Sequence, residues 1–104
     1  MSEGEFVGKT AIVTGGSRGI GRAVCLDLAA GGAKVAVNYT ENKSAADYTV
    51  EEIQNQGLKA ISVKADVSNP DAVKKMASHV EDELGPVDLL VTSAGIVRRE
   101  DHES

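Results

Sequence analysis

Several features typical of other protein classes are scarce or missing in this sequence of 104 residues. A single cysteine, Cys25, leaves no partner for a disulfide within the chain and fits a reducing compartment. No apolar run approaches the roughly 20 residues that a membrane-spanning helix needs. The first residues, Met1 to Glu5, are acidic and lack the basic and apolar regions of a secretory signal peptide. We therefore expect a cytoplasmic protein with no disulfide and no membrane segment.

Positive charge and metal ligands are also in short supply. The formal net charge is −5, with 16 acidic residues against 11 lysines and arginines. Such a chain has no electrostatic footprint for nucleic acid or for an anionic membrane. His79 falls on the polar side of an expected helix and His102 lies in an acidic tail, and no cluster has the spacing of a metal site. The sequence therefore predicts no nucleic-acid partner, no membrane partner and no metal.

What the sequence does contain is a regular alternation of apolar runs and helical periodicity. Strands are expected at 9–14, 33–39, 58–64 and 87–92, and helices at 18–30, at 42–56 and from the segment after Ser68 to the residue before Gly85. Ser68 is the expected cap of the third helix, with Pro70 early in its first turn and Asp71 three residues after the cap. Short β-α-β connections predict an α/β fold: one domain over residues 1–104, built on a doubly wound parallel sheet with strand order 3-2-1-4.

A glycine-rich segment joins the first strand to the first helix. It reads Thr14-Gly15-Gly16-Ser17-Arg18-Gly19-Ile20-Gly21, in which the glycines follow Gly-x-x-x-Gly-x-Gly and not the common Gly-x-Gly-x-x-Gly. The first N–H groups of a helix have no partners within it and its dipole favours negative charge there, so the segment predicts a phosphate site. We expect Gly15 to permit the tight exit from the strand and Gly19 to let a pyrophosphate approach the backbone. Gly21 is expected to let the helix pack close to the sheet.

This segment resembles the cofactor loop of the short-chain dehydrogenase/reductase family, and the surrounding sequence is most similar to its 3-oxoacyl-[acyl-carrier-protein] reductase branch. The resemblance implies a Rossmann-type domain that binds NAD(P) in an oxidoreductase. Such an enzyme moves hydride between nicotinamide and a carbonyl or alcohol carbon of a small molecule, and the resemblance suggests a 3-oxoacyl thioester as that substrate. It also implies a homo-oligomer, a tetramer in the full-length family member. The family's catalytic Ser, Tyr and Lys would follow Ser104, so we expect the cofactor-binding half, truncated before the remaining strands and inactive alone.

The resemblance places the adenosine 2′ position near the end of the second strand, at Asn38-Tyr39-Thr40. Tyr39 holds the position where enzymes that prefer NAD carry an acid. A carboxylate would repel a 2′-phosphate, whereas a guanidinium would bind it bidentately. Arg18, with Thr40 as a hydroxyl donor, therefore favours NADP over NAD, while Glu41 is the charge that opposes this choice.

Further contacts with the cofactor are implied at three places. Asp66 and Val67 would contact the adenine, although Asp66 can also be read as an ordinary turn acid. Thr92-Ser93-Ala94-Gly95 stands where the family usually has Asn-Asn-Ala-Gly, so hydroxyls replace both amides next to the small residues that line the ribose and nicotinamide. The remaining expected contacts are Gly16, Ser17 and Ile20 of the glycine-rich segment. Tyr39 and Lys43 have the spacing of the family's catalytic pair, but we reject them because they lie at the adenosine end.

Two other functions remain open at this point. One is a non-catalytic module that binds NADP(H), and the other is a flavodoxin-like or similar doubly wound domain without a dinucleotide. The pattern also predicts that two helices cover one face of the sheet and the third covers the other. Leu89-Leu90-Val91 would then form an apolar edge strand without a partner, so we expect an isolated chain of marginal stability that tends to associate.

Overall fold

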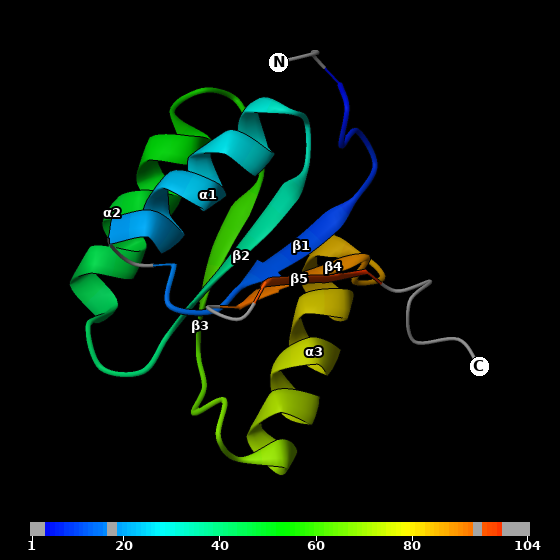
Figure 1. Cartoon of the computed structure of the whole chain (residues 1–104). Coiled ribbons are helices and arrows are strands. Elements are labelled where there is room, and N and C mark those ends of the chain that lie inside the picture. Colours follow the sequence, from blue (N-terminus) through cyan, green and yellow to red (C-terminus); the bar gives the residue numbers. More distant parts are fainter. Residues whose placement is uncertain (1–3, 17–18, 93–94, 99–104) are drawn as a thin grey trace.

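The computed structural model describes residues 4–16, 19–92 and 95–98. Its elements in chain order are β1 (Thr10–Val13), α1 (Gly19–Ala30), β2 (Lys34–Tyr39), α2 (Lys43–Gln54), β3 (Ala60–Lys64), α3 (Pro70–Leu84), β4 (Leu89–Thr92) and β5 (Gly95–Arg98) (Figure 1). The expected helices and the four expected strands are all present, with bounds that differ by at most two residues. None of the described helices is both long enough and apolar enough to cross a membrane.

The strands form one sheet with the order β3-β2-β1-β4-β5. β1 lies parallel to both β2 and β4, and β2 lies parallel to β3, which confirms the predicted order 3-2-1-4. Parallel neighbours need crossover connections, and the helices between the strands supply them. The carboxyl ends of these four strands therefore meet at the same edge of the sheet.

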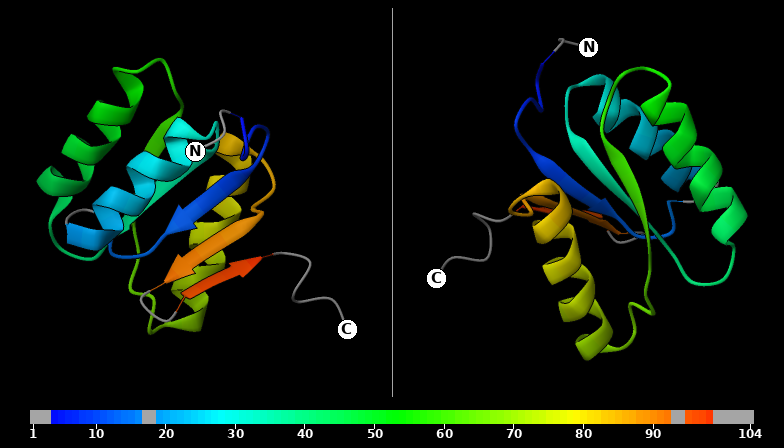
Figure 2. Two further views of the ribbon diagram at one scale, coloured as in Figure 1. Left: turned by 45° about the horizontal axis from the view of Figure 1, so that its top comes forward. Right: turned by 180° about the vertical axis from the view of Figure 1, so that it is seen from behind.

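The expectation of an unpaired edge at β4 is wrong. β4 pairs antiparallel with β5, so that Leu89 lies opposite Arg98 and Thr92 opposite Gly95 (Figure 2). Only two residues separate the two strands, and a connection this short makes an antiparallel hairpin without a crossover. No fifth strand was expected from the sequence, because the residues after Thr92 resemble a segment that contacts the cofactor.

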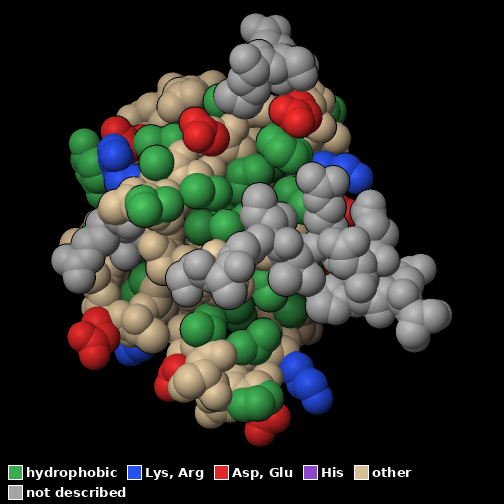
Figure 3. Space-filling view, viewed as in Figure 1, with side chains coloured by type: hydrophobic (Ala, Val, Ile, Leu, Met, Phe, Trp, Pro, Cys, Tyr) green, Lys and Arg blue, Asp and Glu red, His purple; other side chains and the backbone are tan. Residues whose placement is uncertain are grey.

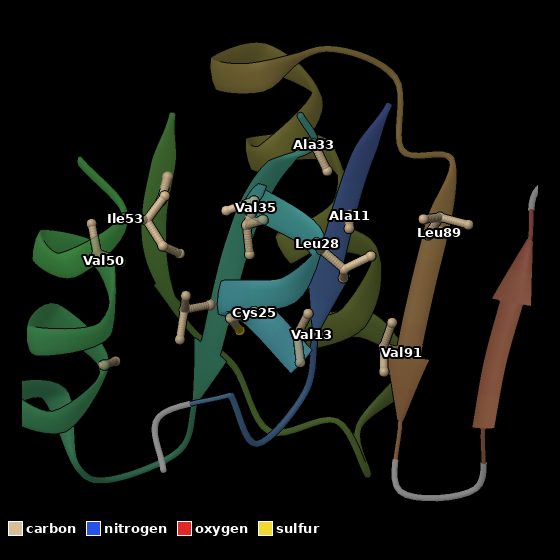
Figure 4. Packing of buried hydrophobic residues seen from close by; sticks show 14 of the residues in the cluster. Ala11, Val13, Cys25, Leu28, Ala33, Val35, Val50, Ile53, Leu89 and Val91 are labelled. Carbon is tan, nitrogen blue, oxygen red and sulfur yellow. The ribbon is translucent and has the colours of Figure 1, made fainter. Parts of the chain in front are cut away.

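The helices lie in two layers, as the sequence predicts. α1 and α2 cover one face of the sheet, and α3 covers the other (Figures 1 and 2). Alternate side chains of β2 enter two separate cores: Val35 and Val37 pack under α1 and α2, whereas Ala36 packs against α3. In the space-filling view, hydrophobic side chains gather between α1 and β4 (Figure 3). The larger core includes Leu28 of α1, Ile53 of α2 and Val91 of β4 (Figure 4).

Asparagine side chains cap α2 and α3. Asn42 Oδ1 accepts the N–H of Ala45 at 3.0 Å. Asn69 Oδ1 accepts the N–H groups of Asp71 at 2.9 Å and Ala72 at 3.3 Å, so the cap of α3 is one residue later than predicted. Pro70 explains this difference, because proline has no N–H and its fixed φ suits the first helical position, directly after the cap.

Candidate functional site

A cleft of about 320 Å³ opens beside the carboxyl ends of β1 and β4. Its walls come from the ends of these strands, the glycine-rich segment and the first turns of α1: Val13, Thr14, Gly15, Ile20, Gly21, Val24, Val91 and Thr92. The Thr14 N–H and hydroxyl both donate to the carbonyl oxygen of Val91, at 2.9 and 3.2 Å, and so join the two strand ends. In doubly wound sheets, ligands bind where the strand order reverses, which is between β1 and β4 here.

Two glycines of the segment are required by backbone conformation. Gly15 has φ +66° and Gly19 has φ +65°, a left-handed region that side chains with a Cβ rarely adopt. A Cβ added at either position would meet no heavy atom within 4 Å. The backbone at both positions therefore faces open space beside the start of α1.

Two other glycines are required because there is no room for a side chain. A Cβ at Gly16 would lie 2.8 Å from Cys25 Sγ and 3.1 Å from Val13 O. A Cβ at Gly21 would overlap the carbonyl oxygen of Gly15 and lie 2.9 Å from its carbonyl carbon. The first turn of α1 therefore packs directly against the backbone of Gly15 and Gly16. Gly21 was expected to allow close packing on the sheet, but the atoms nearest to it belong to these two residues just after β1.

The backbone of Gly16 also makes hydrogen bonds with two buried residues. Its N–H donates to the carbonyl oxygen of Asn38 at 3.3 Å, and Cys25 Sγ lies 3.8 Å from its carbonyl oxygen as a weak donor. Burial raises the pKa of the Cys25 thiol to about 12, so the thiol stays protonated and neutral at physiological pH. Figure 4 shows Cys25, a residue of α1, among the buried hydrophobic side chains. Cys25 is therefore a packing residue beneath the glycine-rich segment.

At the end of β2 the chain changes from buried to exposed. Tyr39 is 8% exposed and belongs to the larger core, whereas Thr40 and Glu41 are exposed. Two residues further on, Lys43 Nζ bonds Asp47 Oδ2 at 2.7 Å, and this hydrogen bond raises the pKa of Lys43. The exposed groups at this strand end are thus a hydroxyl, a carboxylate and a lysine already paired with an aspartate.

Arg22, in the first turns of α1, is already engaged. Its guanidinium forms an ion pair with Glu52 of α2 and lies 5.4 Å from the centre of the Tyr48 ring. Both partners belong to α2, so Arg22 joins the two helices that cover this face of the sheet.

The segment after β3 forms a tight polar turn. Asp66 Oδ1 accepts the N–H of Ser68 at 2.9 Å and its hydroxyl at 2.6 Å, and these bonds lower the pKa of Asp66. The carboxylate is exposed, and the neighbouring Val67 side chain is 47% exposed. Asp66 therefore does have the contacts of a turn acid, while it also presents a charged group beside an exposed apolar surface.

Residues 9–104 match the family model described as short chain dehydrogenase. The chain belongs to the short-chain dehydrogenase family. A short chain dehydrogenase of Pseudocercospora fijiensis is 53% identical over 96 residues, which are 92% of this chain and 31% of that protein. The 3-oxoacyl-[acyl-carrier-protein] reductase FabG of Staphylococcus epidermidis is 47% identical over 90 residues, 86% of this chain and 37% of that protein.

A solved structure agrees in fold as well as in sequence. The crystal structure of a short chain dehydrogenase from Burkholderia cenocepacia in complex with NADP matches with a TM-score of 0.78 and 42% identity, over 82% of this chain and 35% of that one. The chain therefore spans about a third of the length of these relatives. Membership of the short-chain dehydrogenase family contradicts the flavodoxin-like alternative.

Only some of the site residues expected from the sequence lie in the described structure. Ser17, Arg18, Ser93 and Ala94 lie outside it. Gly15, Ile20 and Gly21 line the cleft, Gly16 and Gly19 are the sequence neighbours of lining residues, and Gly95 begins β5. Within the described ranges, no group of three or more His, Cys, Asp and Glu residues could hold a metal ion.

Tyr39 and Lys43, which only have the spacing of the family's catalytic pair, have other roles in the fold. Tyr39 packs in the core at the end of β2, and Lys43 begins α2 with its ammonium on Asp47. Their four-residue spacing spans a strand end and a helix start, so it does not place them on one helical face.

The contacts of one buried residue beside the site were not foreseen from the sequence. Asn38 is 3% exposed, and its Nδ2 donates to the carbonyl oxygens of Val63 at 3.3 Å and Ala65 at 3.2 Å. Its only signal in the sequence is an amide that follows the apolar run of β2. A polar residue at a strand end is usually exposed, and burial at this position depends on how β3 continues beside it.

Proposed function

We propose that this chain is the cofactor-binding part of an NADP-dependent oxidoreductase that transfers hydride between nicotinamide and a carbonyl or alcohol carbon. The observation that carries this proposal is the open backbone of Gly15 and Gly19 at the start of α1, directly beside the cleft. Helix N-termini attract phosphate groups because their first N–H groups are unpaired within the helix and their dipole is positive there. The bound cofactor would supply the hydride chemistry, and this chain would bind and orient it.

The shape of the glycine-rich segment fits a pyrophosphate. Gly15 and Gly19 leave space beside the backbone, while Gly16 and Gly21 let α1 rest directly on the segment. The N–H groups at the start of α1 are thereby held at a constant distance from the cleft. Thr14 keeps the ends of β1 and β4 together beneath them.

Charge at the adenosine end supports NADP over NAD. Arg18 lies within the glycine-rich segment, and the other nearby arginine, Arg22, is engaged by Glu52 and Tyr48. Tyr39 is buried, so Thr40 offers the exposed hydroxyl at the end of β2. We therefore assign the 2′-phosphate to Arg18 and Thr40, against the opposing charge of Glu41.

The adenine is assigned to Asp66 and Val67. The exposed carboxylate of Asp66 can accept a hydrogen bond from the exocyclic amine, and Val67 offers an apolar surface that is 47% exposed. Ser93, Ala94 and Gly95 are assigned to the ribose on the nicotinamide side, next to the cleft wall formed by Thr92.

For the whole protein we propose a cytoplasmic homo-oligomer that acts on a small carbonyl or alcohol substrate. A 3-oxoacyl thioester is the substrate class that the FabG relative supports. The rival proposal is a module that binds NADP(H) without catalysis, and the sequence that follows Ser104 distinguishes the two. A serine followed by Tyr-x-x-x-Lys in the coding sequence after Ser104 would support the enzyme, and a stop codon there would support the module.

The binding proposal is tested by titrating the purified protein with NADPH and with NADH. Two matched variants, Arg18→Gln and Arg22→Gln, each remove one positive charge from the same region. We expect tighter binding of NADPH than of NADH, and a loss of about tenfold or more for NADPH in Arg18→Gln, because a bidentate contact with phosphate is lost. Arg22→Gln should leave both affinities nearly unchanged. Equal affinities for the two cofactors that neither variant alters would contradict the NADP assignment, and no binding of either would contradict the function itself.

A further inference from the structure

Three segments of the proposed cofactor site meet at Asn38, at the carboxyl end of β2. Its backbone carbonyl oxygen accepts the N–H of Gly16 at 3.3 Å. Its side-chain amide donates to Val63 O at 3.3 Å and Ala65 O at 3.2 Å. The next residue, Tyr39, accepts the N–H of Ala65 at 3.1 Å. One buried residue thus bonds both the glycine-rich segment and the end of β3.

We infer that Asn38 is a positioning residue that orients the Asp66–Val67 segment relative to the glycine-rich segment, and so sets the affinity of the site for adenine dinucleotides. This inference rests on the proposed function, because it assigns a role in the same site. Asn38 is 3% exposed and does not line the cleft, so it would act through the segments that it holds.

The peptide that joins Ala65 to Asp66 is the link between them. A peptide unit is planar, so fixing the Ala65 carbonyl also fixes the direction of the Asp66 N–H and limits where the Asp66 side chain can lie. Tyr39 holds only the N–H of Ala65, which belongs to the preceding peptide. Without the Asn38 amide, the Ala65–Asp66 peptide would lose a bond that determines its orientation.

The turn after Asp66 continues this chain of contacts. Asp66 Oδ1 binds the N–H and hydroxyl of Ser68, and Asn69 N–H donates to Asp66 O at 3.0 Å. Asn69 in turn caps α3. The turn is therefore held by hydrogen bonds of its own, and Asn38 is the residue that bonds both the peptide at its start and Gly16.

Asparagine suits this position because both protons of its amide find carbonyl acceptors. Aspartate has the same shape but would place carboxylate oxygens against the carbonyls of Val63 and Ala65. Alanine would remove both donors and leave buried carbonyl groups with fewer partners. We therefore expect no other side chain of this size to replace Asn38 without loss.

The test is a double-mutant cycle on NADPH affinity in the purified protein, with Asn38→Ala, Asp66→Ala and the double variant. Each single change should weaken NADPH binding about tenfold, which corresponds to one or two hydrogen bonds. If Asn38 acts through Asp66, the double variant should lose little more than either single variant, far short of the roughly 100-fold that independent effects would give. The matched control is Val35→Ala, a fully buried position in the same strand, which should lower thermal stability but leave affinity nearly unchanged.

The outcomes separate the inference from the proposed function. A wild-type protein that binds neither NADPH nor NADH would contradict the proposed function and the inference with it. Tight wild-type binding with Asn38→Ala equal to Val35→Ala, or with additive losses in the cycle, would contradict the inference alone.

Should Asn38→Ala fail to fold, the wild-type protein itself supplies a second measurement. We expect the side-chain amide protons of Asn38 and the N–H of Gly16 to exchange slowly with solvent in nuclear magnetic resonance spectra. Saturation with 2′,5′-ADP, which carries the adenine and the 2′-phosphate, should slow both further and together. Exchange at the rate of free amides, or exchange that the ligand does not change, would overturn the inference.

Discussion

Two segments at the same edge of the sheet are built in opposite ways. In the segment after β1, the described positions depend on missing side chains, because Gly16 and Gly21 have no room for a Cβ and Gly15 and Gly19 have positive φ. The segment after β3, from Asp66 to Asn69, takes its shape from polar side chains that bond the backbone beside them. The first brings bare backbone to the cleft, and the second holds a charged and an apolar side chain in place.

This difference determines how each segment should respond to substitution. In the glycine-rich segment a single added Cβ should have a large effect, because it overlaps backbone atoms that cannot move without moving α1 or β1. In the segment from Asp66 to Asn69, each substitution should remove one exposed hydrogen bond and lower the stability only slightly.

Gly21→Ala should have the largest effect. The added methyl group overlaps the carbonyl oxygen of Gly15, so the first turn of α1 must move away from the glycine-rich segment. We expect a loss in the free energy of unfolding of about 1–3 kcal/mol or more, as for other overpacked sites. NADPH binding should become undetectable. Urea unfolding and NADPH titration measure the two effects, with Ala23→Ser, an exposed change in the same helix, as the control.

Unchanged NADPH affinity in Gly21→Ala would show that the contact between α1 and the segment is not what presents the backbone to the cofactor. The glycine-rich segment would then be no more sensitive to substitution than the segment from Asp66 to Asn69.

Gly19→Ala and Gly57→Ala form a matched pair. Both glycines have positive φ, +65° and +80°, and a Cβ at either would meet no heavy atom within 4 Å. Each change should therefore lower the free energy of unfolding by a similar amount, about 1–2 kcal/mol, because of backbone strain alone. Only Gly19→Ala should also weaken NADPH binding, because only its methyl group would stand beside the start of α1. Equal NADPH affinities in the two variants would argue against a phosphate at this backbone.

Ser68→Ala should have the smallest effect, and one that depends on pH. The hydroxyl and N–H of Ser68 lower the pKa of Asp66, and the variant loses the hydroxyl contact, so this pKa should rise toward its ordinary value. A carboxyl whose pKa is lowered by folding stabilises the native state above its unfolded pKa, and this contribution is lost as pH falls through the folded pKa. The variant should therefore be less stable than wild type at pH 7 and nearly equal to it under acidic conditions where Asp66 is protonated.

Titration of Asp66 by nuclear magnetic resonance, together with urea unfolding at both pH values, measures this effect. Ser44→Ala, an exposed change at the start of α2, is the control. A stability difference that stays constant with pH would assign the loss to something other than the Asp66 carboxylate.

The fold could be read from the sequence almost completely, because its signals are local. Apolar runs such as Val35–Val37 and the glycines that end helices set the elements, and short connections between them allow few topologies. The two failures were local as well. The cap of α3 moved from Ser68 to Asn69 because proline favours the position after the cap, and β5 was missed because the residues after Thr92 were assigned to the cofactor site.

The amino-acid sequence alone determined the Gly-x-x-x-Gly-x-Gly segment, the order of the four parallel strands and therefore the edge of the sheet at which a ligand would bind. These follow from spacing and periodicity, which are properties of neighbouring residues. Only the tertiary structure decided that Tyr39 is buried, that Arg22 is engaged by Glu52, and that Asn38 connects Gly16 with Ala65. Each of these depends on which segment, distant in sequence, lies next to the residue, because burial and hydrogen bonding are set by neighbours in space.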